Sequence, residues 1–266
     1  MTGLSASKSS DFSRPIAPGF LHLWFCRVPV EAAPDSLSAQ VTILSPAERE
    51  RCQRLPEQNR AQALLTRWLV RTVLSRYVDV DPAQWRFESG ENGKPLAACG
   101  DQQAPPFNLS HSHGWIACAV AGQGRVGVDV EAWASSRDYM RMARRYFTLA
   151  EREQLEMLAG APQQQRFYEL WTLKEAWSKA RGGNIGSALG AVAFDLGRPG
   201  RIVVTAADAN PGSFWLAEPA AGVRLALCQQ QGPARAPELA VFEAIPGVGE
   251  AGLALPLLAT TDGAGG

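Results

Sequence analysis

An internal repeat constrains the fold of this chain more than any other feature of its sequence. Residues 47–50 and residues 150–153 are the same tetrapeptide, Ala-Glu-Arg-Glu. The same shift of 103 residues places Trp68 on Trp171 and Arg71 on Lys174. Further along the chain, a shift of 107 residues places Phe87 on Phe194. Matches that keep one order indicate a duplication. The competing interpretation is accidental similarity between two amphipathic helices.

Each copy of the repeat has the pattern of a helical stretch followed by short strands. Capping boxes at residues 45–48 and 148–151 predict that a helix starts in each copy. Pro56 interrupts the first helical stretch, and a long amphipathic helix then extends to about residue 77, with a counterpart from about residue 162 to 181. We therefore predict an α+β fold, a pseudo-dimer of two similar α+β halves, each a long helix packed on a small, mainly antiparallel sheet. A cleft between such halves is a place where small-molecule sites often form.

The expected organisation is two halves between two tails. We expect a disordered tail over residues 1–16, an N-terminal half over 17–134, a C-terminal half over 135–246 and a flexible tail over 247–266. The first tail is rich in serine and lacks the apolar segment of a signal peptide. The second is rich in glycine, alanine and leucine and has no charge pattern.

Charge and cysteine content argue against several classes of protein. The 26 lysines and arginines balance the 26 aspartates and glutamates, so no overall basic field indicates nucleic acid as a partner. Apolar runs fall far short of the ~20 residues that span a bilayer, and we expect no membrane partner. The five cysteines are scattered without a CxxC pair, which argues against a disulfide framework and a conventional zinc finger. The default expectation is a reduced, cytoplasmic location.

Three acidic residues are candidates to meet where the halves join. Asp129 and Glu131 alternate with valines, so their carboxylates point to one face of a strand, ~6–7 Å apart. Glu175 stands where the first half has Thr72, and the repeat therefore supplies it only once. Such oxygen ligands suit Mg²⁺, which binds one or two carboxylates together with phosphates and water. The competing interpretations are a solvated strand face for the pair and a surface ion pair of Glu175 with Lys179.

Hydroxyl, imidazole and basic side chains are candidates for phosphate binding. Ser110 and His111 lie in a polar connection between two strand-like runs, where such groups can hold phosphate oxygens. Lys94 ends a turn and can meet a phosphate as a point charge. A transition-metal site at His111 and His113, or a polar hairpin without a ligand, are the alternatives. A stripe on the first long helix is either an anion platform or a solvated face: Arg60, Arg67 and Arg71.

Three motifs follow one another in a characteristic order. They are residues 107–112 (Phe-Asn-Leu-Ser-His-Ser), 127–131 (Gly-Val-Asp-Val-Glu) and 171–179 (Trp-Thr-Leu-Lys-Glu-Ala-Trp-Ser-Lys), with Gly-Lys-Pro at 93–95 ahead of them. Over roughly residues 40–230 this combination closely resembles the 4'-phosphopantetheinyl transferase family of the Sfp type. The family's fold is a pseudo-dimer of two α+β halves in one chain, in agreement with the repeat. The family moves 4'-phosphopantetheine from coenzyme A to a serine of an apo carrier protein and releases adenosine 3',5'-bisphosphate.

The resemblance implies catalytic roles for Asp129, Glu175 and Lys179, and a metal-binding role for Glu131 beside them. Asp129, Glu131 and Glu175 would hold Mg²⁺ against the pyrophosphate of coenzyme A. Glu175 would also accept the proton of the carrier serine, directly or through water. Lys179 would neutralise or protonate the leaving phosphate.

The resemblance also implies contacts to the coenzyme. A set of polar and basic residues would bind it: Ser110 and His111 at its phosphates, Lys94 and Arg51 near its adenosine 3'-phosphate, and Lys174 and Lys179 as cations. One position departs from the family pattern, because a residue that is often basic there is Glu48 in this chain, where the capping box uses it. Arg49 or Arg54 could then supply the missing contact to the 3'-phosphate.

The partner implied by the resemblance is an acyl carrier protein or a peptidyl carrier domain. Such carriers are usually acidic, so the arginine stripe could serve docking of the carrier. Because two halves in one chain already form a pseudo-dimer, we expect a monomer. Two other functions stay open at this point: a metal-dependent phosphohydrolase that uses the same acids with water as nucleophile, and a non-catalytic module that binds coenzyme A or a carrier.

Overall fold

The computed structural model describes most of the chain in seven stretches: residues 19–29, 37–90, 94–133, 138–183, 189–206, 211–232 and 237–261. The tail expected over residues 1–16 lies outside the described residues, as do Gly93 and the last five residues of the second expected tail. No helix among the described stretches is both long enough and apolar enough to cross a membrane.

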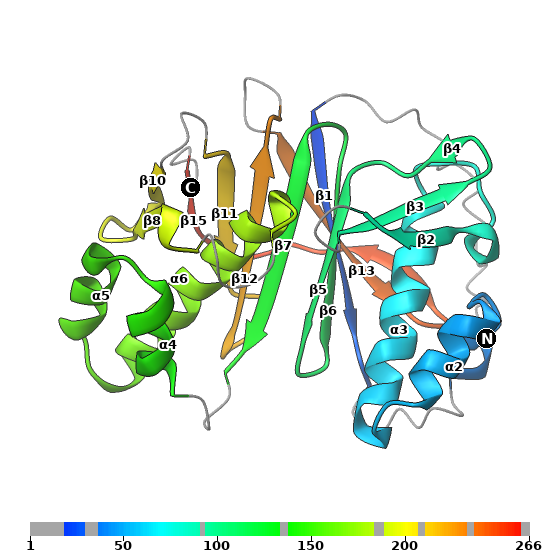
Figure 1. Ribbon diagram of the computed structural model, residues 1–266, viewed down its shortest axis with the longest axis horizontal. Helices are drawn as coiled ribbons and strands as arrows, with labels where there is room; N and C mark the ends of the chain where they lie inside the picture. The colour runs from blue at the N-terminus through cyan, green and yellow to red at the C-terminus, as the bar shows by residue number, and fades with distance from the viewer. Residues whose placement is uncertain are drawn as a thin grey trace, which may run out of the picture.

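The first half packs helices against one face of a five-stranded sheet (Figure 1). The helices are α1 (Ser38–Val41), α2 (Pro46–Gln53) and α3 (Glu57–Leu74), and a 3-10 turn, η2, follows at Pro82–Gln84. The sheet has the order β14-β13-β1-β6-β5, in which only β1 and β13 are parallel. Its strands are β1 (Phe20–Arg27), β5 (Phe107–Ser112), β6 (Trp115–Ala121), β13 (Glu238–Ile245) and β14 (Gly249–Gly252). A separate small sheet contains β2 (Arg86–Ser89), β3 (Pro95–Cys99) and β4 (Gln102–Gln103).

The second half repeats this plan beside the first (Figure 1). Its helices are α4 (Tyr139–Tyr146), α5 (Leu149–Glu156) and α6 (Gly160–Ala180), and a 3-10 turn, η4, lies at Leu189–Ala191. Its sheet has the order β7-β12-β11-β15-β9, from β7 (Arg125–Ala132), β9 (Gly200–Arg201), β11 (Ser213–Ala217), β12 (Val223–Gln230) and β15 (Leu257–Thr260). A two-stranded sheet pairs β8 (Val192–Asp195) with β10 (Val203–Ala206). The predicted α+β pseudo-dimer with mainly antiparallel sheets is confirmed.

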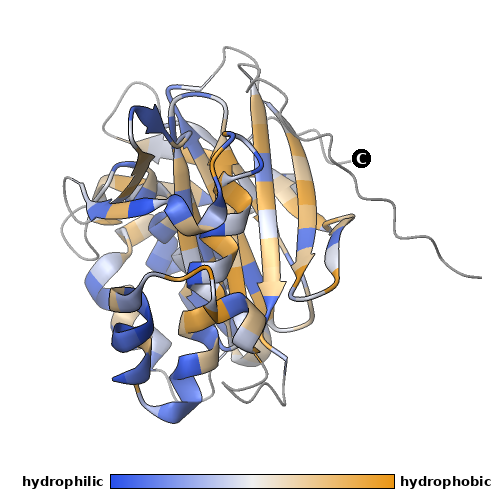
Figure 2. Cartoon of the chain, turned by 90° about the vertical axis from the view of Figure 1, so that its right-hand side faces the viewer, coloured by the Kyte–Doolittle hydropathy of each residue, from blue (hydrophilic) through white to orange (hydrophobic). Residues whose placement is uncertain are grey.

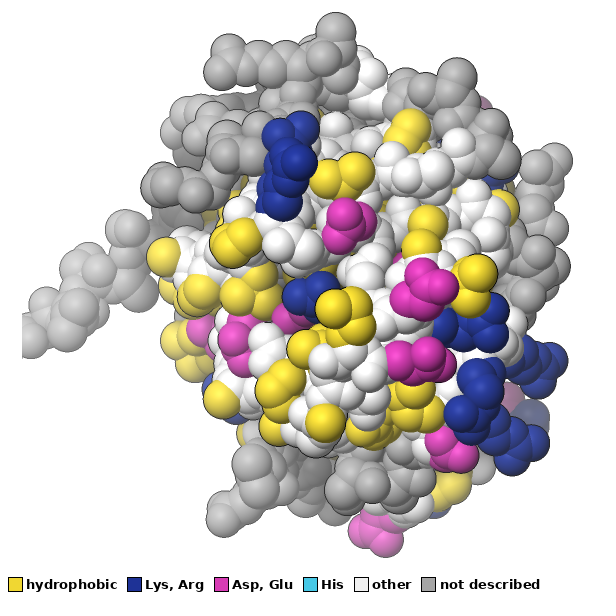
Figure 3. Space-filling model, turned by 90° about the vertical axis from the view of Figure 1, so that its left-hand side faces the viewer, with side chains coloured by type: hydrophobic (Ala, Val, Ile, Leu, Met, Phe, Trp, Pro, Cys, Tyr) yellow, Lys and Arg dark blue, Asp and Glu magenta, His cyan; other side chains and the backbone are white. Residues whose placement is uncertain are grey.

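Three hydrophobic clusters hold the layers together. One lies between the helices and the sheet of each half, and the third lies between the two sheets. Strands are largely apolar and the outer faces of the helices largely polar (Figure 2). Side chains of β7 alternate between its two faces, and Val126, Val128 and Val130 are all buried in the cluster between the sheets. Asp129 and Glu131 therefore face the opposite side. On the outer face of the second half, basic, acidic and apolar side chains are intermixed (Figure 3).

The repeated tetrapeptide has the same structural role in both halves. Glu48 and Glu151 close the two predicted capping boxes, and each also pairs with a buried cation on the following long helix. Glu48 Oε2 lies 2.7 Å from Arg71 Nη2, and Glu151 Oε2 lies 2.9 Å from Lys174 Nζ. Both cations also donate to backbone carbonyls of the next 3-10 turn or strand: Arg71 to Pro82 and Ala83, Lys174 to Leu189 and Val192. The duplication is therefore visible in the buried ion pairs as well as in the order of elements.

Near the predicted boundaries of the halves, some strands pair in the sheet of the other half. β7 precedes the boundary expected at 134/135, yet it pairs with β12 in the second sheet. β13 pairs with β1 in the first sheet. Within the segment expected to be a flexible tail from residue 247, β14 pairs with β13 and β15 pairs with β11. These two four-residue strands are bonded through backbone groups, which any sequence carries, so their composition showed no strand pattern.

Candidate active site

The candidate site lies along a seam between β5 and β7, strands that run side by side but belong to different sheets. Side chains of β5 bond the backbone of β7 here. Asn108 Oδ1 accepts from the Val128 N–H at 2.9 Å. Ser110 Oγ accepts from the Val130 N–H at 3.2 Å, and Ser112 Oγ accepts from the Ala132 N–H at 3.3 Å. Because every second residue of a strand faces the same side, all three bridges point into one seam.

Asp129 stands at the centre of this seam. Its Oδ1 accepts hydrogen bonds from Ser110 Oγ at 2.9 Å and from Lys179 Nζ at 2.7 Å. Its Oδ2 is buried and has no hydrogen-bond partner within the described part of the chain. Burial raises the pKa of Asp129, and the ammonium of Lys179 opposes this rise. The carboxylate is therefore only partly compensated by its neighbours.

Glu175 on α6 faces the same seam. It is 3% exposed, and its Oε1 is buried without a hydrogen-bond partner among the described residues. Burial raises the pKa of Glu175 to about 7; the charges of Asp129 and Glu131 add to the rise, and Lys179 opposes it. The meeting of the three acids at one metal ion stays a prediction; a divalent cation between them would relieve the repulsion that Asp129 and Glu131 exert on Glu175.

A glycine brings α6 close enough to β7 for this arrangement. A Cβ built on Gly127 would lie 2.0 Å from the carbonyl oxygen of Ala176 and 2.5 Å from the Ala180 nitrogen. Any other residue would push the helix away from the strand. The close approach places Glu175 and Lys179 over Asp129.

Glu131 is held differently from Asp129. It is partly exposed, and its Oε2 accepts from Ser112 Oγ at 3.0 Å. Within the described stretches, no group of three or more His, Cys, Asp or Glu side chains is arranged as a ready metal site. In this structure the ammonium of Lys179 supplies the positive charge beside Asp129.

His111 is oriented by a residue that the sequence did not indicate. Gln62 on α3 accepts from the Gly114 N–H through Oε1 at 2.9 Å, so its NH₂ group faces His111 Nδ1, also at 2.9 Å. Nδ1 is therefore the acceptor, and the neutral ring carries its proton on Nε2. Partial burial lowers the pKa of His111, and the charges of Lys179 and Arg67 lower it further. Gln62 carries no sequence signal, because it is a single polar residue on an amphipathic helix.

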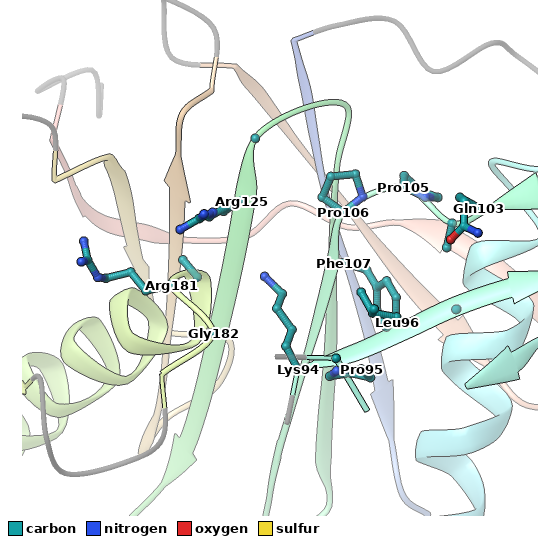
Figure 4. A pocket seen from close by; sticks show the side chains of 15 residues that line it. Lys94, Pro95, Leu96, Gln103, Pro105, Pro106, Phe107, Arg125, Arg181 and Gly182 are labelled. Atoms are coloured by element: carbon teal, nitrogen blue, oxygen red, sulfur yellow. The ribbon is translucent and has the colours of Figure 1, made fainter. Parts of the chain in front are cut away.

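Lys94 borders a cavity at one end of the seam (Figure 4). The cavity has a volume of about 470 Å³ and is lined by side chains of both halves, with Phe107 on one side and Arg125 and Arg181 on the other. Lys94 Nζ donates to the Val126 carbonyl at 3.2 Å. Burial lowers the pKa of Lys94, and the nearby Arg125 adds to this effect. Three cations around one opening favour an anionic ligand.

Two cations from the sequence analysis lie away from the seam. Lys174 is fully buried against Glu151, so its ammonium supports the start of α5 and cannot reach a coenzyme as expected. Arg71, part of the predicted arginine stripe, is 2% exposed and paired with Glu48, so it is no part of an anion platform. Both corrections have one cause: a capping-box glutamate is buried in each half and needs a cation beside it.

Apart from Lys94, the basic residues expected near a 3'-phosphate lie on or beside α2. Arg51 is exposed on this helix. Arg49 and Arg60 line a second cavity of about 520 Å³ between α1, α2 and α3. Arg54 is paired with Glu50 at 2.6 Å. Arg49 and Arg51 thus stand on the same short helix, turned to different sides.

Comparisons with known proteins agree on both halves. A family model described as the 4'-phosphopantetheinyl transferase superfamily matches residues 125–228, and one described as 4'-phosphopantetheinyl transferase, N-terminal, matches residues 31–123. The chain is 30% identical to 4'-phosphopantetheinyl transferase Sfp of Bacillus subtilis over 190 residues, 71% of this chain and 83% of the relative. It is 35% identical to 4'-phosphopantetheinyl transferase HetI of a Nostoc species (62% of this chain, 70% of the relative) and 34% identical to a phosphopantetheinyl transferase of a Thraustochytrium species (67% of each). The two family models meet between β6 and β7, where the chain passes from one sheet to the other.

Proposed function

Because the chain belongs to the 4'-phosphopantetheinyl transferase superfamily, we propose that the seam between β5 and β7, with α6 packed over it, is its active site. The chain transfers phosphopantetheine from coenzyme A to carrier proteins. The observation that carries the location is the pair of buried carboxylate oxygens, Asp129 Oδ2 and Glu175 Oε1, which have no hydrogen-bond partner in the residues described. Buried polar atoms without a partner are rare and indicate a missing ligand or a functional role.

The chemistry of the donor set at the seam would suit a magnesium ion. Asp129, Glu131 and Glu175 offer carboxylate oxygens, the ligands that Mg²⁺ prefers, and Asp129 Oδ2 and Glu175 Oε1 are buried without a hydrogen-bond partner among the described residues. These three residues would hold the ion. When bound, it would neutralise charge on the coenzyme's pyrophosphate.

Two side chains of the seam would then have separate roles in the transfer reaction. Glu175 would take the proton of the carrier serine, a role that suits a carboxyl whose pKa is about 7. The serine oxygen forms a bond to the phosphorus that bears pantetheine, and the bond from that phosphorus to adenosine 3',5'-bisphosphate breaks. Lys179 would neutralise or protonate the leaving phosphate, and the reaction needs little beyond positioning and charge neutralisation.

Five other residues would bind the coenzyme. His111 would donate from Nε2 to a phosphate oxygen, since Gln62 occupies Nδ1. Ser110 lies beside it on β5, and Lys94 and Arg51 would face the adenosine 3'-phosphate. Arg67 lies near enough to lower the pKa of His111, so it belongs with this group of cations.

The protein substrate we propose is an acyl carrier protein or a peptidyl carrier domain. Its acidic surface would meet exposed basic side chains of the first half, for which Arg60, beside the cavity between α1, α2 and α3, remains a candidate because it is only part-buried. We also propose a monomer in a reduced, cytoplasmic compartment. Two halves in one chain and five cysteines that are all unpaired support this proposal.

An intact-mass assay tests the location of the site. The protein is mixed with coenzyme A, Mg²⁺ and a panel of apo carriers, with EDTA as a control. We expect a phosphopantetheine mass gain that EDTA abolishes and that Glu175→Ala removes, whereas Glu156→Ala, which changes an exposed glutamate at the end of α5, keeps it. Lys179→Ala should lower the rate more than it weakens coenzyme binding. A folded Glu175→Ala protein with normal turnover would place the active site elsewhere.

The same assay separates the two alternative functions. A phosphohydrolase would consume coenzyme A without any carrier. A binding module would bind the coenzyme and leave it intact. The transferase matches on both halves support neither alternative.

A further inference from the structure

We infer that Ser112 is a positioning residue for the transfer reaction: its hydroxyl holds the carboxylate of Glu131 and, with the same atom, ties β5 to β7. The inference rests on the proposed function, because it takes Glu131 as a magnesium ligand. Ser112 itself would touch neither the ion nor the substrates.

The hydrogen bonds of Ser112 use its hydroxyl completely. Oγ lies 3.0 Å from Glu131 Oε2, 3.3 Å from the Ala132 nitrogen and 3.1 Å from His113 Nδ1. A hydroxyl has one proton to donate and two lone pairs to accept. A carboxylate can only accept and a backbone N–H can only donate. The hydroxyl of Ser112 therefore donates its proton to Glu131 and accepts the Ala132 N–H with one lone pair. The second lone pair faces His113 Nδ1, which then carries its proton there.

Ser110 repeats the same pattern two residues earlier. Its Oγ donates to Asp129 Oδ1 and accepts from the Val130 N–H, while Lys179 Nζ fills the remaining position. Each serine thus joins a carboxylate of β7 to the N–H of the residue that follows that carboxylate. Because the pleat of a strand repeats every two residues, the spacing of the serines matches the spacing of the acids.

The side chain of Glu131 is longer and more exposed than that of Asp129. Asp129 is 5% exposed and is held by Ser110 and Lys179 together. Glu131 is partly exposed and has a longer side chain with more rotamers to lose. Hydrogen bonds to metal-ligating side chains orient the ligand, and their removal typically costs about 10–100-fold in metal affinity.

Asn108 supplies a matched control for the seam. Its Oδ1 accepts from the Val128 N–H at 2.9 Å, so it ties β5 to β7 as the serines do, but Val128 has no carboxylate to hold. It is 6% exposed and Ser112 is 8% exposed, so both substitutions are made in buried surroundings. Loss of a seam bond and loss of the Glu131 contact can therefore be separated.

The test measures binding of Mn²⁺ alone to the full chain by electron paramagnetic resonance, with thermal unfolding of each variant alongside. We expect Ser112→Ala to weaken Mn²⁺ binding about 10-fold and Ser112→Thr, which keeps the hydroxyl, to restore it. Asn108→Ala should lower thermal stability and leave Mn²⁺ affinity within about 2-fold of wild type. In a Glu131→Gln background, Ser112→Ala should have no further effect on Mn²⁺ affinity.

The outcomes distinguish the inference from the function on which it rests. Unchanged Mn²⁺ affinity in Ser112→Ala, or an equal loss in Asn108→Ala, would overturn the inference while the proposed metal site stands. If wild type and Glu131→Gln bind Mn²⁺ equally, or neither binds it, the metal role of Glu131 fails and the inference fails with it. If Ser112→Ala does not fold, Ser112→Cys provides the second variant, because a thiol of similar size is a much weaker donor and should weaken Mn²⁺ binding in the same direction.

Discussion

Replacing Glu175 by glutamine should make the metal-free protein more stable at neutral and alkaline pH. The pKa of Glu175 is raised from 4.5 to about 7 in the folded chain, chiefly by burial and then by the charges of Asp129 and Glu131. Below pH 4.5 the carboxyl is protonated in both the folded and the unfolded chain. Between pH 4.5 and 7 the folded chain binds more protons than the unfolded chain, so the free energy of unfolding falls as pH rises. Above pH 7 the loss is complete.

The size of the effect follows from the two pKa values. A difference between 4.5 and about 7 corresponds to about 3 kcal/mol at 1.36 kcal/mol per pH unit. Glutamine has nearly the shape of glutamate but carries no charge at any pH. We therefore expect Glu175→Gln to exceed wild type by about 3 kcal/mol at pH 8 and to equal it at pH 4.

Urea denaturation in EDTA at a series of pH values measures this difference. Glu156→Gln, which removes a charge from an exposed glutamate, is the control and should stay within about 0.5 kcal/mol of wild type. Saturating Mg²⁺ should narrow the gap, because an ion that binds the folded wild type stabilises it. Equal stability of wild type and Glu175→Gln at pH 8 would refute the argument, and so would a gap that opens toward acidic pH.

Two further predictions concern residues that support the site. Lys174→Met leaves Glu151 buried without its cation and should lower the free energy of unfolding, measured by urea denaturation, by about 3–5 kcal/mol. Arg54→Met breaks an exposed ion pair and should lower it by less than about 1 kcal/mol; equal losses in the two variants would contradict the structural role of Lys174. Gln62→Leu should lower kcat/KM for coenzyme A about 10-fold, because it releases the ring of His111. In a His111→Ala background Gln62→Leu should have no further effect; additive losses would contradict the contact between the two side chains.

Local patterns were enough to predict where helices begin. Both capping boxes formed as expected, because the serine or threonine and the glutamate that close them are only three residues apart. The pairing of β13 with β1, over two hundred residues earlier in the chain, could not be derived from its pattern. Nor could the short strands β14 and β15, since backbone hydrogen bonds between strands require no particular side chains.

The site shows the same division between near and distant residues. Alternation on β7 predicted that Asp129 and Glu131 share a face, and the repeat singled out Glu175. Ser112 belongs to the motif at residues 107–112, but the sequence predicted no role for it, because its partner Glu131 is on another strand. Gln62 gave no signal at all, because the ring that it orients, His111, lies 49 residues further along the chain.

The sequence by itself determined the periodicities, the caps and the duplication of this protein, which depend on neighbours within a few residues. Tertiary structure decided which of several similar cations serve the seam. Lys174 and Lys179 lie on one helix, ~140° apart about its axis, and the packing of α6 against β7 at Gly127 directs Lys179 to Asp129 and Lys174 to Glu151. The rotation of a helix is set by the surface against which it packs, and that surface is built from strands distant in the chain.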